Sequence, residues 1–315
     1  MRHPAAPIRM AGFAFACAML GLCQQAAAAT LLVGAGRPYS QPSAAAAAAH
    51  DGDRIEIAAG TYTGCAVWTA ANLTIAGAGR DKTTITGTPC LGKGLFVTTG
   101  NNIAVRDLTL AGAHVADFNG AGIRAEGGAL TVDHVGFAND EDGILAGSMP
   151  DARIVVRDSV FSGNGSCAGS GCAHGIYVGH IALLRVERSR FFNTRDGHDI
   201  KSRALRTEVI GCDLADGTGG TSSFAIDVPN GGSVLIQGNH IQKGPLSGNR
   251  TAAVAIGEEG AIQPTPSIIV EDNTFAAEGG YTSYLVVNHA RTGAVLRHNI
   301  LRGGAAALSD SGTSG

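Results

Sequence analysis

The stretch Ile154-Val-Val-Arg-Asp-Ser-Val-Phe161 carries the pattern that decides the fold of this 315-residue chain. It joins a short β-branched strand to a polar turn and then to a large apolar residue. The same pattern occurs eight times, and the central residues of its strands stand 23 to 34 residues apart. Those central residues are Val105, Val132, Val156, Val186, Val209, Ile236, Val270 and Leu296.

Repeats at this spacing are typical of solenoid proteins. One such unit is too short to bury a core of its own, so successive units have to stack on one another. No helical pattern separates the strands. We therefore predict an all-β fold, a right-handed parallel β-helix of about nine to eleven coils, because parallel crossover connections are nearly always right-handed.

A second series of strands lies between the first. Alternation along these strands directs one apolar residue of each into the core, namely Ile123, Ile144, Ile176, Ile200 and Ile226. The residue that follows each isoleucine then points outward, and we expect these outward residues to lie one above another. They are Arg124, Leu145, Tyr177, Lys201 and Asp227.

Two further ladders are predicted within the coils. Three asparagines stand three residues after a central strand residue, a position suited to a hydrogen-bonded turn ladder. They are Asn239, Asn273 and Asn299. Four phenylalanines stand five residues after a central strand residue, and we expect them to stack in the core. They are Phe137, Phe161, Phe191 and Phe275.

The N-terminal segment, residues 1–29, is typical of a secretory signal peptide. Two arginines precede an apolar run, residues 10–23, that is too short to span a bilayer comfortably, and residues 26–29 offer a cleavage site of small side chains. We therefore expect a periplasmic or secreted protein without stable membrane insertion. The mature chain is expected to begin near Thr30.

The remaining chain is predicted to form one β-helix domain over residues 30–303, followed by a disordered tail over residues 304–315, which is small and polar. Before the first coils, Ser43 is the expected N-cap of a short helix over residues 44–49. Such a helix would cover the exposed end of the apolar core, as solenoids require.

Five cysteines follow the signal segment, and an oxidising compartment allows them to pair. Cys65 and Cys90 stand 25 residues apart, about one coil, so stacking can bring them together. Cys167 and Cys172 flank a flexible loop that can close a small ring. Cys212 occupies a turn position held elsewhere by serine or asparagine, and we expect a buried, unpaired thiol.

Acidic and basic residues nearly balance, with a formal net charge of −3. Removal of residues 1–29 takes away two arginines and no acid, which leaves −5. Such a protein has no general attraction for nucleic acid or for an anionic membrane. We therefore expect neither as a partner, and we expect a monomer.

Ionisable residues concentrate in Gly197-His-Asp-Ile-Lys-Ser-Arg203, and stacking places further polar residues on the coils before and after it. Proton-transfer groups on adjacent rungs suit a shallow sugar groove. The candidate catalytic residues are Lys201, Arg203, His198, Tyr177 and His174. The candidate substrate-binding residues are Asp227, Asn230, Arg124 and Arg195, and Asp199 is the candidate metal ligand. A solvated charged face held by ion pairs is the alternative interpretation.

The local charge favours an acidic partner. Seven basic residues gather in one short segment, namely Arg185, Arg188, Arg190, Arg195, Lys201, Arg203 and Arg206. Guanidinium and ammonium groups hold carboxylates well. The sequence therefore predicts an acidic polysaccharide, such as a polyuronate, as the ligand of this region.

The repeats and the entry segment Gly52-Asp-Arg-Ile-Glu-Ile-Ala-Ala-Gly-Thr-Tyr62 resemble the right-handed parallel β-helix superfamily of pectate-lyase-like proteins, over roughly residues 30–303. This superfold hosts lyases, hydrolases, epimerases and inert binding proteins, so the resemblance speaks for the fold and little for function. A shorter segment, Asp199-Ile-Lys-Ser-Arg203, is similar to the lysine-bearing strand of the alginate lyase and chondroitinase B family.

The second resemblance implies a mechanism. In that family a lysine is the base of a β-elimination, an arginine one coil further assists, and calcium neutralises the uronate carboxylate. Carried over, Lys201 is the base. The chain departs from the pattern in the next coil, where Asp227 stands in place of arginine. From the residues themselves, Arg203 is the expected carboxylate clamp, and Tyr177 or His174 the expected acid.

A polysaccharide lyase that works by β-elimination is therefore the favoured activity, with no cofactor or with calcium. Two alternatives stay open. The first is a non-catalytic cell-surface or glycan-binding β-helix protein. The second is a polyuronate C5-epimerase, which would share the first proton abstraction and return the proton to the other face of the sugar. A polygalacturonase-like hydrolase fits less well, because no paired Asp-Asp motif stands in the neighbouring coil.

Overall fold

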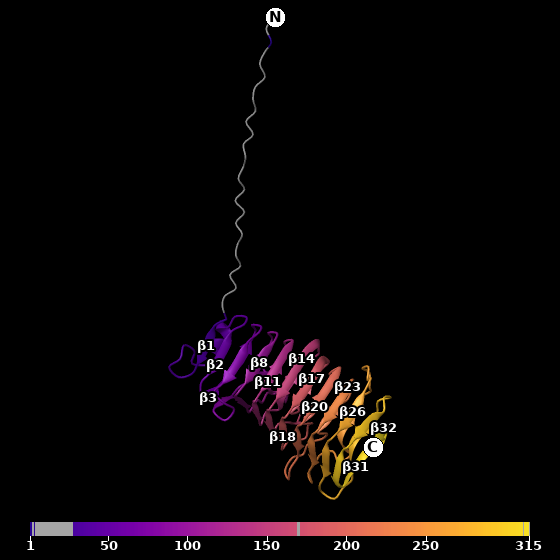
Figure 1. Ribbon diagram of the computed structural model, residues 1–315. Coiled ribbons are helices and arrows are strands. Elements are labelled where there is room, and N and C mark those ends of the chain that lie inside the picture. Colours follow the sequence, from indigo (N-terminus) through magenta and orange to yellow (C-terminus); the bar gives the residue numbers. More distant parts are fainter. Residues whose placement is uncertain (2, 4–27, 169–170, 311, 315) are drawn as a thin grey trace.

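The computed structural model describes residues 1, 3, 28–168, 171–310 and 312–314. The strands lie side by side along one axis, from β1 at one end to β31 and β32 at the other (Figure 1). The fold is a parallel β-helix of about 10 turns, as the repeat pattern predicted. Most of the expected signal segment lies outside the described residues. Among the residues that are described, no helix has the length and apolar character needed to cross a membrane.

Three parallel sheets, here called A, B and C, run along the axis, with 12 described strands in sheet A and 10 each in sheets B and C. Sheet A contains β1 (Thr30–Val33), β2 (Arg54–Ile57), β5 (Thr74–Gly77), β8 (Ile103–Arg106), β11 (Ala129–Asp133), β14 (Met149–Arg157), β17 (Ile181–Glu187), β20 (Arg206–Ile210), β23 (Ser233–Gln237), β26 (Ile268–Glu271), β29 (Ala294–Arg297) and β32 (Gly312–Ser314).

Sheet B contains β3 (Gly60–Thr63), β6 (Thr83–Thr86), β9 (Thr109–Ala111), β12 (Gly136–Ala138), β15 (Val160–Ser162), β18 (Arg190–Phe192), β21 (Asp213–Ala215), β24 (His240–Lys243), β27 (Thr274–Ala277) and β30 (Ile300–Gly303). Sheet C contains β4 (Ala66–Trp68), β7 (Gly94–Thr98), β10 (Ala121–Ala125), β13 (Asp142–Ala146), β16 (Ile176–Val178), β19 (Ile200–Ser202), β22 (Ile226–Val228), β25 (Ala252–Ile256), β28 (Ser283–Asn288) and β31 (Ala305–Asp310).

The core consists of the predicted ladders. The eight central residues of the repeat pair in register along sheet A, and all are at most 3% exposed. In sheet B, the ring of Phe161 stacks between those of Phe137 and Phe191, at centroid distances of 4.5 and 4.4 Å. The isoleucines of sheet C are fully buried. Each coil therefore buries its apolar side chains within its own interior and against the coils before and after it.

The turn ladder is also confirmed. The backbone N–H of Asn239 donates to Oδ1 of Asn273 at 2.9 Å, and the N–H of Asn273 donates to Oδ1 of Asn299 at 3.0 Å. The backbone N–H of Cys212 donates to Oδ1 of Asn239 in the same way, at 2.8 Å. These side chains satisfy backbone donors at turns that the sheets leave unpaired.

The cysteines pair as the sequence suggested. Cys65 and Cys90 form a disulfide with a Cα–Cα distance of 5.4 Å, and Cys167 and Cys172 form a second one. Cys212 is a buried free thiol, and burial raises its pKa to about 12. Its thiol is therefore protonated at neutral pH and packs as a small apolar side chain.

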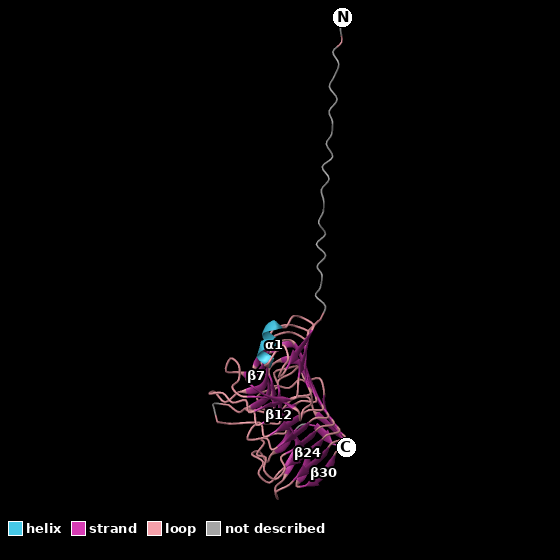
Figure 2. Ribbon diagram, turned by 90° about the vertical axis from the view of Figure 1, so that its left-hand side faces the viewer, coloured by secondary structure: helices cyan, strands magenta, loops and turns pink. Residues whose placement is uncertain are grey.

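The expected capping helix is present as α1 (Pro42–Ala48), at the N-terminal end of the stack (Figure 2). It packs against β1 and β4, and buries Ala45 and Ala46. The expected N-cap was wrong. The helix starts at Pro42, with Gln41 as its N-cap, because the fixed φ of proline suits the first helical position.

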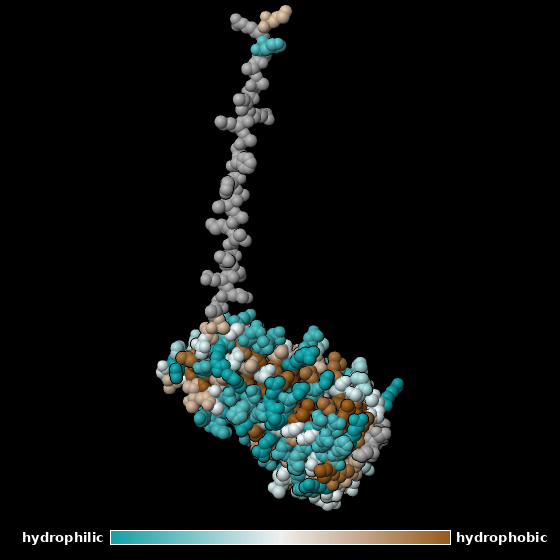
Figure 3. Space-filling model, viewed as in Figure 1, coloured by the Kyte–Doolittle hydropathy of each residue, from teal (hydrophilic) through white to brown (hydrophobic). Residues whose placement is uncertain are grey.

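The C-terminal tail also differs from expectation. Residues 305–310 form β31, which pairs with β28, and residues 312–314 form β32, which pairs with β29. The last full coil pairs with the preceding coil along one edge and leaves backbone groups unpaired along the other, so small, polar residues can still add one more rung there. The face in Figure 3 is mainly hydrophilic, with apolar residues scattered among polar ones.

Candidate functional site

The outward face of sheet C carries most of the predicted site. Successive strands pair Arg124 with Leu145, Leu145 with Tyr177, Tyr177 with Lys201, and Lys201 with Asp227. The five side chains therefore form one row along the helix axis, one per coil, as alternation predicted. The sheet fixes their order and spacing, because neighbouring strands lie ~4.8 Å apart.

Lys201 is the centre of a charged cluster. Its Nζ lies 2.7 Å from Oε1 of Glu259 and 3.4 Å from Oδ2 of Asp227, and its side chain is 13% exposed. The same ammonium lies 5.9 Å from the ring centre of Tyr177. Lys201 thus bridges a carboxylate of the neighbouring rung and a carboxylate from a loop.

Arg203 is held by three different groups. Its Nε donates to the hydroxyl of Tyr177 at 3.0 Å, one Nη donates to Oε2 of Glu259 at 2.6 Å, and the other donates to Oδ1 of Asn230. The loop after β25 also fastens this arginine, because Nε2 of Gln263 donates to its backbone carbonyl at 2.7 Å. The orientation of the guanidinium is therefore set from several coils.

The carboxylate of Glu259 spans the two cations. One oxygen contacts Lys201 and the other contacts Arg203, while the Glu259 side chain remains 45% exposed. Hydrogen bonds from Lys201 and Arg203 lower the pKa of Glu259 against the effect of its partial burial. The site thus already binds a carboxylate, at a point that opens to solvent.

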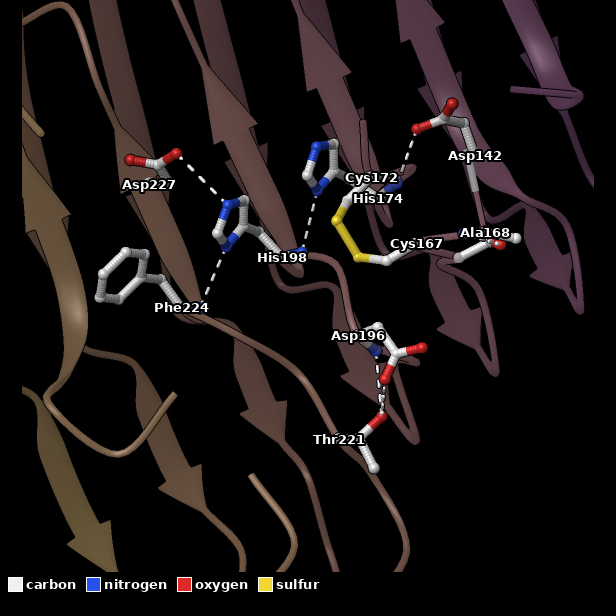
Figure 4. The surroundings of a disulfide bond; sticks show 11 residues. Asp142, Cys167, Ala168, Cys172, His174, Asp196, His198, Thr221, Phe224 and Asp227 are labelled. Atoms are coloured by element: carbon white, nitrogen blue, oxygen red, sulfur yellow. Dashed lines mark hydrogen bonds and ion pairs between the residues drawn. A yellow bond between two sulfur atoms is a disulfide. The ribbon is translucent and has the colours of Figure 1, made fainter. Parts of the chain in front are cut away.

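Beside this cluster runs a ladder of side chains that bind backbone N–H groups (Figure 4). The N–H of His174 donates to Oδ1 of Asp142 at 2.7 Å, and the N–H of His198 donates to Nδ1 of His174 at 2.9 Å. The N–H of Phe224 donates in turn to Nδ1 of His198 at 3.0 Å. The two imidazole rings stack at 4.8 Å, with 5° between their planes.

This ladder sets the protonation of both histidines. A nitrogen that accepts a hydrogen bond carries no proton, so each neutral ring has its proton on Nε2. Nε2 of His198 lies 3.4 Å from Oδ2 of Asp227 and can donate to it. Burial and then the charge of Lys201 lower the pKa of His198 to about 3, and burial also lowers the pKa of His174 well below its usual value.

Asp227 is the second carboxylate that contacts Lys201. It is 3% exposed, and its Oδ1 has no hydrogen-bond partner among the described residues. Burial raises its pKa to about 6, while Lys201 acts in the opposite direction. At neutral pH it is therefore ionised and balances the charge of Lys201.

The opposite end of the row opens into a cavity of about 400 Å³. Arg124, Leu145 and Tyr177 from the row line it, together with Asp142. Phe118, from the loop between β9 and β10, and Cys172 of the second disulfide stand at its walls. Burial raises the pKa of Asp142 to about 8.

Several predicted site residues have other roles in the structure. His174 was an expected acid, but it is 3% exposed and supports His198 by stacking and by a hydrogen bond. Asn230 was expected to bind substrate, but it is 5% exposed and holds Arg203. Arg195 is exposed and lines a separate cavity with His114 and Phe118.

Asp199, the candidate metal ligand, does not belong to the row of outward side chains and is buried. It precedes β19, so the alternation that holds within a strand does not reach it. It is 3% exposed, and burial raises its pKa to about 7. The charges of Asp216 and Lys243 act on its carboxyl group, and its side chain forms a hydrogen bond with Thr194.

Calcium, implied by the resemblance, finds no suitable ligand set at these residues. Asp199 lies beside the cation of Lys243, and the carboxylates of Asp227 and Glu259 are occupied by Lys201. Within the described part of the chain, no cluster of three or more His, Cys, Asp or Glu side chains is arranged to hold a metal. The residues present therefore do not fit calcium.

The predicted basic band is dispersed. Four of its arginines lie in strands of sheets A and B or in a turn between them, and they pair with acids there, away from the row of sheet C. These pairs are Arg185 with Glu208, Arg188 with Asp158, Arg190 with Asp213, and Arg206 with Glu208. Of the predicted band, Lys201 and Arg203 remain at the site, and Arg124 adds a further positive charge at the other end of the row.

Two residues of the site, Asp142 and Glu259, belong to the polar residues of neighbouring coils but were not among the candidate catalytic or binding residues. Asp142 had a signal, because it stands two residues before Ile144, as the two histidines of the ladder stand before their isoleucines. Glu259 had none. It comes from a loop after β25, and the length of a loop does not reveal which coil its side chains reach.

No protein-family model matches this sequence, and no curated protein matches it. Similar solved structures do exist. Pectin methylesterase PemA from Erwinia chrysanthemi is 10% identical, with a TM-score of 0.48 over 88% of this chain and 93% of that chain. An alginate lyase from Paenibacillus sp. str. FPU-7 is 17% identical, with a TM-score of 0.46 over 91% and 99% of the two chains.

The A-module of the mannuronan C-5 epimerase AlgE4 from Azotobacter vinelandii is 17% identical, with a TM-score of 0.43 over 86% of this chain and 92% of that chain. The names of these three proteins describe three different reactions. The likeness is one of β-helix architecture, and the function of this chain has to be argued from its own residues.

Proposed function

We propose that this protein is an exported polysaccharide lyase that cleaves an acidic polysaccharide by β-elimination next to Lys201 and Arg203. One observation carries the proposal. The two cations hold the carboxylate of Glu259 between them at 2.7 and 2.6 Å, while the Glu259 side chain stays 45% exposed to solvent. A uronate carboxylate that replaces that of Glu259 would meet the same two donors.

Binding at this point supplies the first requirement of the reaction. The proton at C5 of a uronate becomes acidic only when the neighbouring carboxylate is neutralised. Arg203 offers planar donors, and Lys201 adds a point charge. Asn230 and Gln263 keep Arg203 in place, and Asp227 keeps Lys201 in place, so little reorganisation accompanies binding.

The contacts of Lys201 change the role that the sequence suggested for it. A lysine can act as a base only with a free electron pair on Nζ, and nearby cations favour that form. The direct partners of Lys201 are instead the carboxylates of Asp227 and Glu259. We assign Lys201 to the neutralisation of the substrate carboxylate, together with Arg203.

Tyr177 is then the proton-transfer group. Its hydroxyl accepts from Nε of Arg203 at 3.0 Å, and the ammonium of Lys201 lies 5.9 Å from its ring centre. As a phenolate it takes the proton from C5. The C5–H electron pair forms the C4=C5 double bond while the C4–O4 bond breaks. O4 then takes the proton from the Tyr177 hydroxyl, which restores the phenolate.

The test begins with purified mature protein and a panel of alginate, pectate and chondroitin. Ultraviolet absorbance reports the unsaturated uronate that β-elimination creates. We expect turnover of at least one of these substrates without added metal, and unchanged turnover in the presence of a chelator. Export is tested by N-terminal sequencing of periplasmic or secreted material, which should begin near Thr30.

Three variants separate the roles. Tyr177→Phe should lower kcat by about 100-fold or more and leave binding intact, because general acid–base catalysis contributes about 10²–10⁴. Lys201→Ala should abolish turnover and also weaken binding, with the fold intact. Arg297→Gln, on the exposed surface of sheet A, is the matched control.

Other outcomes would favour one of the alternative functions or would contradict the proposal. Binding without any unsaturated product would favour the glycan-binding protein. Exchange of the C5 proton with solvent deuterium, without cleavage, would favour the epimerase. Full activity of Lys201→Ala would contradict the assigned site, and no binding of any polyuronate at low salt would contradict the proposed function itself.

A further inference from the structure

The cavity at the Arg124 end of the row is open at its base. The residues that follow β10, β13, β16 and β19 occupy equivalent positions beside the row, and they are Glu126, Gly147, Gly179 and Arg203. Neither glycine places a side chain between the charged residues at either end. A Cβ on Gly179 would meet the backbone of Gly147 and Ser148 at 2.9 Å, so the open space lies at Gly147. A Cβ added to Gly147 would meet no heavy atom within 4 Å.

Arg124 faces this cavity with spare hydrogen-bonding capacity. Its side chain is 22% exposed, and its Nε makes a long ion-pair contact of 3.5 Å with Oε1 of Glu126. The same oxygen of Glu126 binds Nζ of Lys93 at 2.7 Å. Within the described residues, Nε of Arg124 is buried without a hydrogen bond, which is a costly state for a charged group.

The walls of the cavity suit a sugar. Leu145 and the ring of Tyr177 form an apolar stretch of the row between its cationic ends, and Phe118 adds a second aromatic side chain. Apolar and aromatic surfaces with a few placed polar groups are typical of small-molecule sites. The volume of about 400 Å³ lies in the range of such sites, roughly 300–1,000 Å³.

The spacing relates this cavity to the proposed cleavage point. Arg124 and Lys201 stand three rungs apart in one row, through Leu145 and Tyr177. Three rungs of ~4.8 Å span about 14 Å. The length of a 1,4-linked pyranose residue is close to the distance between two rungs, so sugars at the two ends are about three residues apart in the ligand.

We propose that the cavity around Arg124 is a second acidic-sugar subsite, which binds the carboxylate of a uronate about three residues away from the one held by Lys201 and Arg203. The polysaccharide then lies along the helix axis, over Leu145 and Tyr177. This inference rests on the proposed function and deepens it, because it sets the shortest ligand that fills both subsites at about four residues.

Asp142 supports the assignment from the wall of the cavity. It accepts a hydrogen bond from the backbone N–H of His174, and the charges that act on it are those of Arg124 and Glu141. Because burial raises its pKa to about 8, it is protonated at neutral pH and can donate to a sugar oxygen or carboxylate. An ionised aspartate at the same place would repel the ligand.

The experiment measures the affinity of oligouronates of two, three, four and six residues by calorimetry, with Tyr177→Phe as the background so that cleavage is slow during the titration. Affinity should rise most steeply between three and four residues. Arg124→Gln should weaken binding of the tetramer and hexamer by about tenfold and leave the dimer unchanged. Arg297→Gln is the control for loss of one positive charge.

A second variant guards against a folding defect in Arg124→Gln. Gly147→Leu adds a side chain to the open base, at a position without a positive φ, and should block the long oligomers while the dimer still binds. Equal binding of all lengths in wild type and both variants would overturn this inference and leave the proposed function standing. Equal affinity for a neutral tetrasaccharide would overturn its acidic character. If no oligouronate binds, the result contradicts the proposed function and, with it, this inference.

Discussion

Nδ1 of His198 accepts a hydrogen bond from the backbone N–H of Phe224 at 3.0 Å. That bond decides which nitrogen of the ring carries a proton, and it turns Nε2 toward Oδ2 of Asp227 at 3.4 Å. Asp227 in turn contacts Nζ of Lys201 at 3.4 Å. The backbone of one coil thereby orients a side-chain network that ends at the proposed carboxylate site.

Nitrogen chemical shifts measured by NMR should show His198 with a proton on Nε2 and none on Nδ1 between pH 5 and 9. Its pKa is lowered to about 3 by burial and by Lys201, so its ring does not titrate in that range. The unfolded chain takes up a proton near pH 6.5, so His198 contributes stability that declines as the pH falls from 6.5 toward 3. Titration of the ring near pH 6.5 in the folded protein would contradict the ladder.

Turnover should decline as the pH is lowered, and this acid limb of the pH–rate profile should have an apparent pKa near 6. Burial raises the pKa of Asp227 to about 6, with Lys201, Arg203 and Glu259 as its charged neighbours and His198 beside it. Below that pH Asp227 becomes neutral and no longer holds Lys201. Asp227→Asn should remove the limb and lower kcat/KM by about 10- to 100-fold, as expected for a lost charged hydrogen bond of about 1.5–3 kcal/mol. An unchanged profile in this variant would assign the limb to another group.

Glu259→Gln should strengthen the binding of oligouronates. The Glu259 carboxylate competes with the ligand for Lys201 and Arg203, but at 45% exposure its ion pairs are screened. A gain of about 1 kcal/mol, roughly fivefold in affinity, is expected. Glu258→Gln is the matched control, because the neighbouring Glu258 contacts His289 at 3.1 Å and neither of the two cations. Weaker binding by Glu259→Gln would mean that Glu259 helps to hold the ligand.

Phe161→Ala should lower the free energy of unfolding by about 3–5 kcal/mol, because its ring is 1% exposed and stacks on two others. Phe192→Ala is the comparison. Phe192 lies on the neighbouring strand, is half-buried, and has Arg190 over its ring at 5.8 Å. Phe192→Ala should lower the free energy of unfolding by about 1 kcal/mol. Denaturant unfolding of both variants measures the difference, and equal losses would contradict the stacked core.

Periodicity alone was enough to predict the β-helix, its buried ladders and the row from Arg124 to Asp227. In a solenoid, each residue meets the residue at the same position of the next coil, so the spacing of a repeat translates directly into contacts. The alternation of strand side chains then decides which residues face outward. The same logic correctly paired the cysteines and placed the four phenylalanines in the core. Three of them stack on one another, whereas Phe275 lies between Ile241 and Leu301.

Only the tertiary structure decided how the charges of the site are paired. Asp199 stands one residue outside a strand, so alternation did not apply to it, and it is buried beside Lys243. Glu259 reaches Lys201 from a loop 58 residues further along the chain. Loops and turns carry no period, and the charge state of a buried group depends on every neighbour that the fold brings to it.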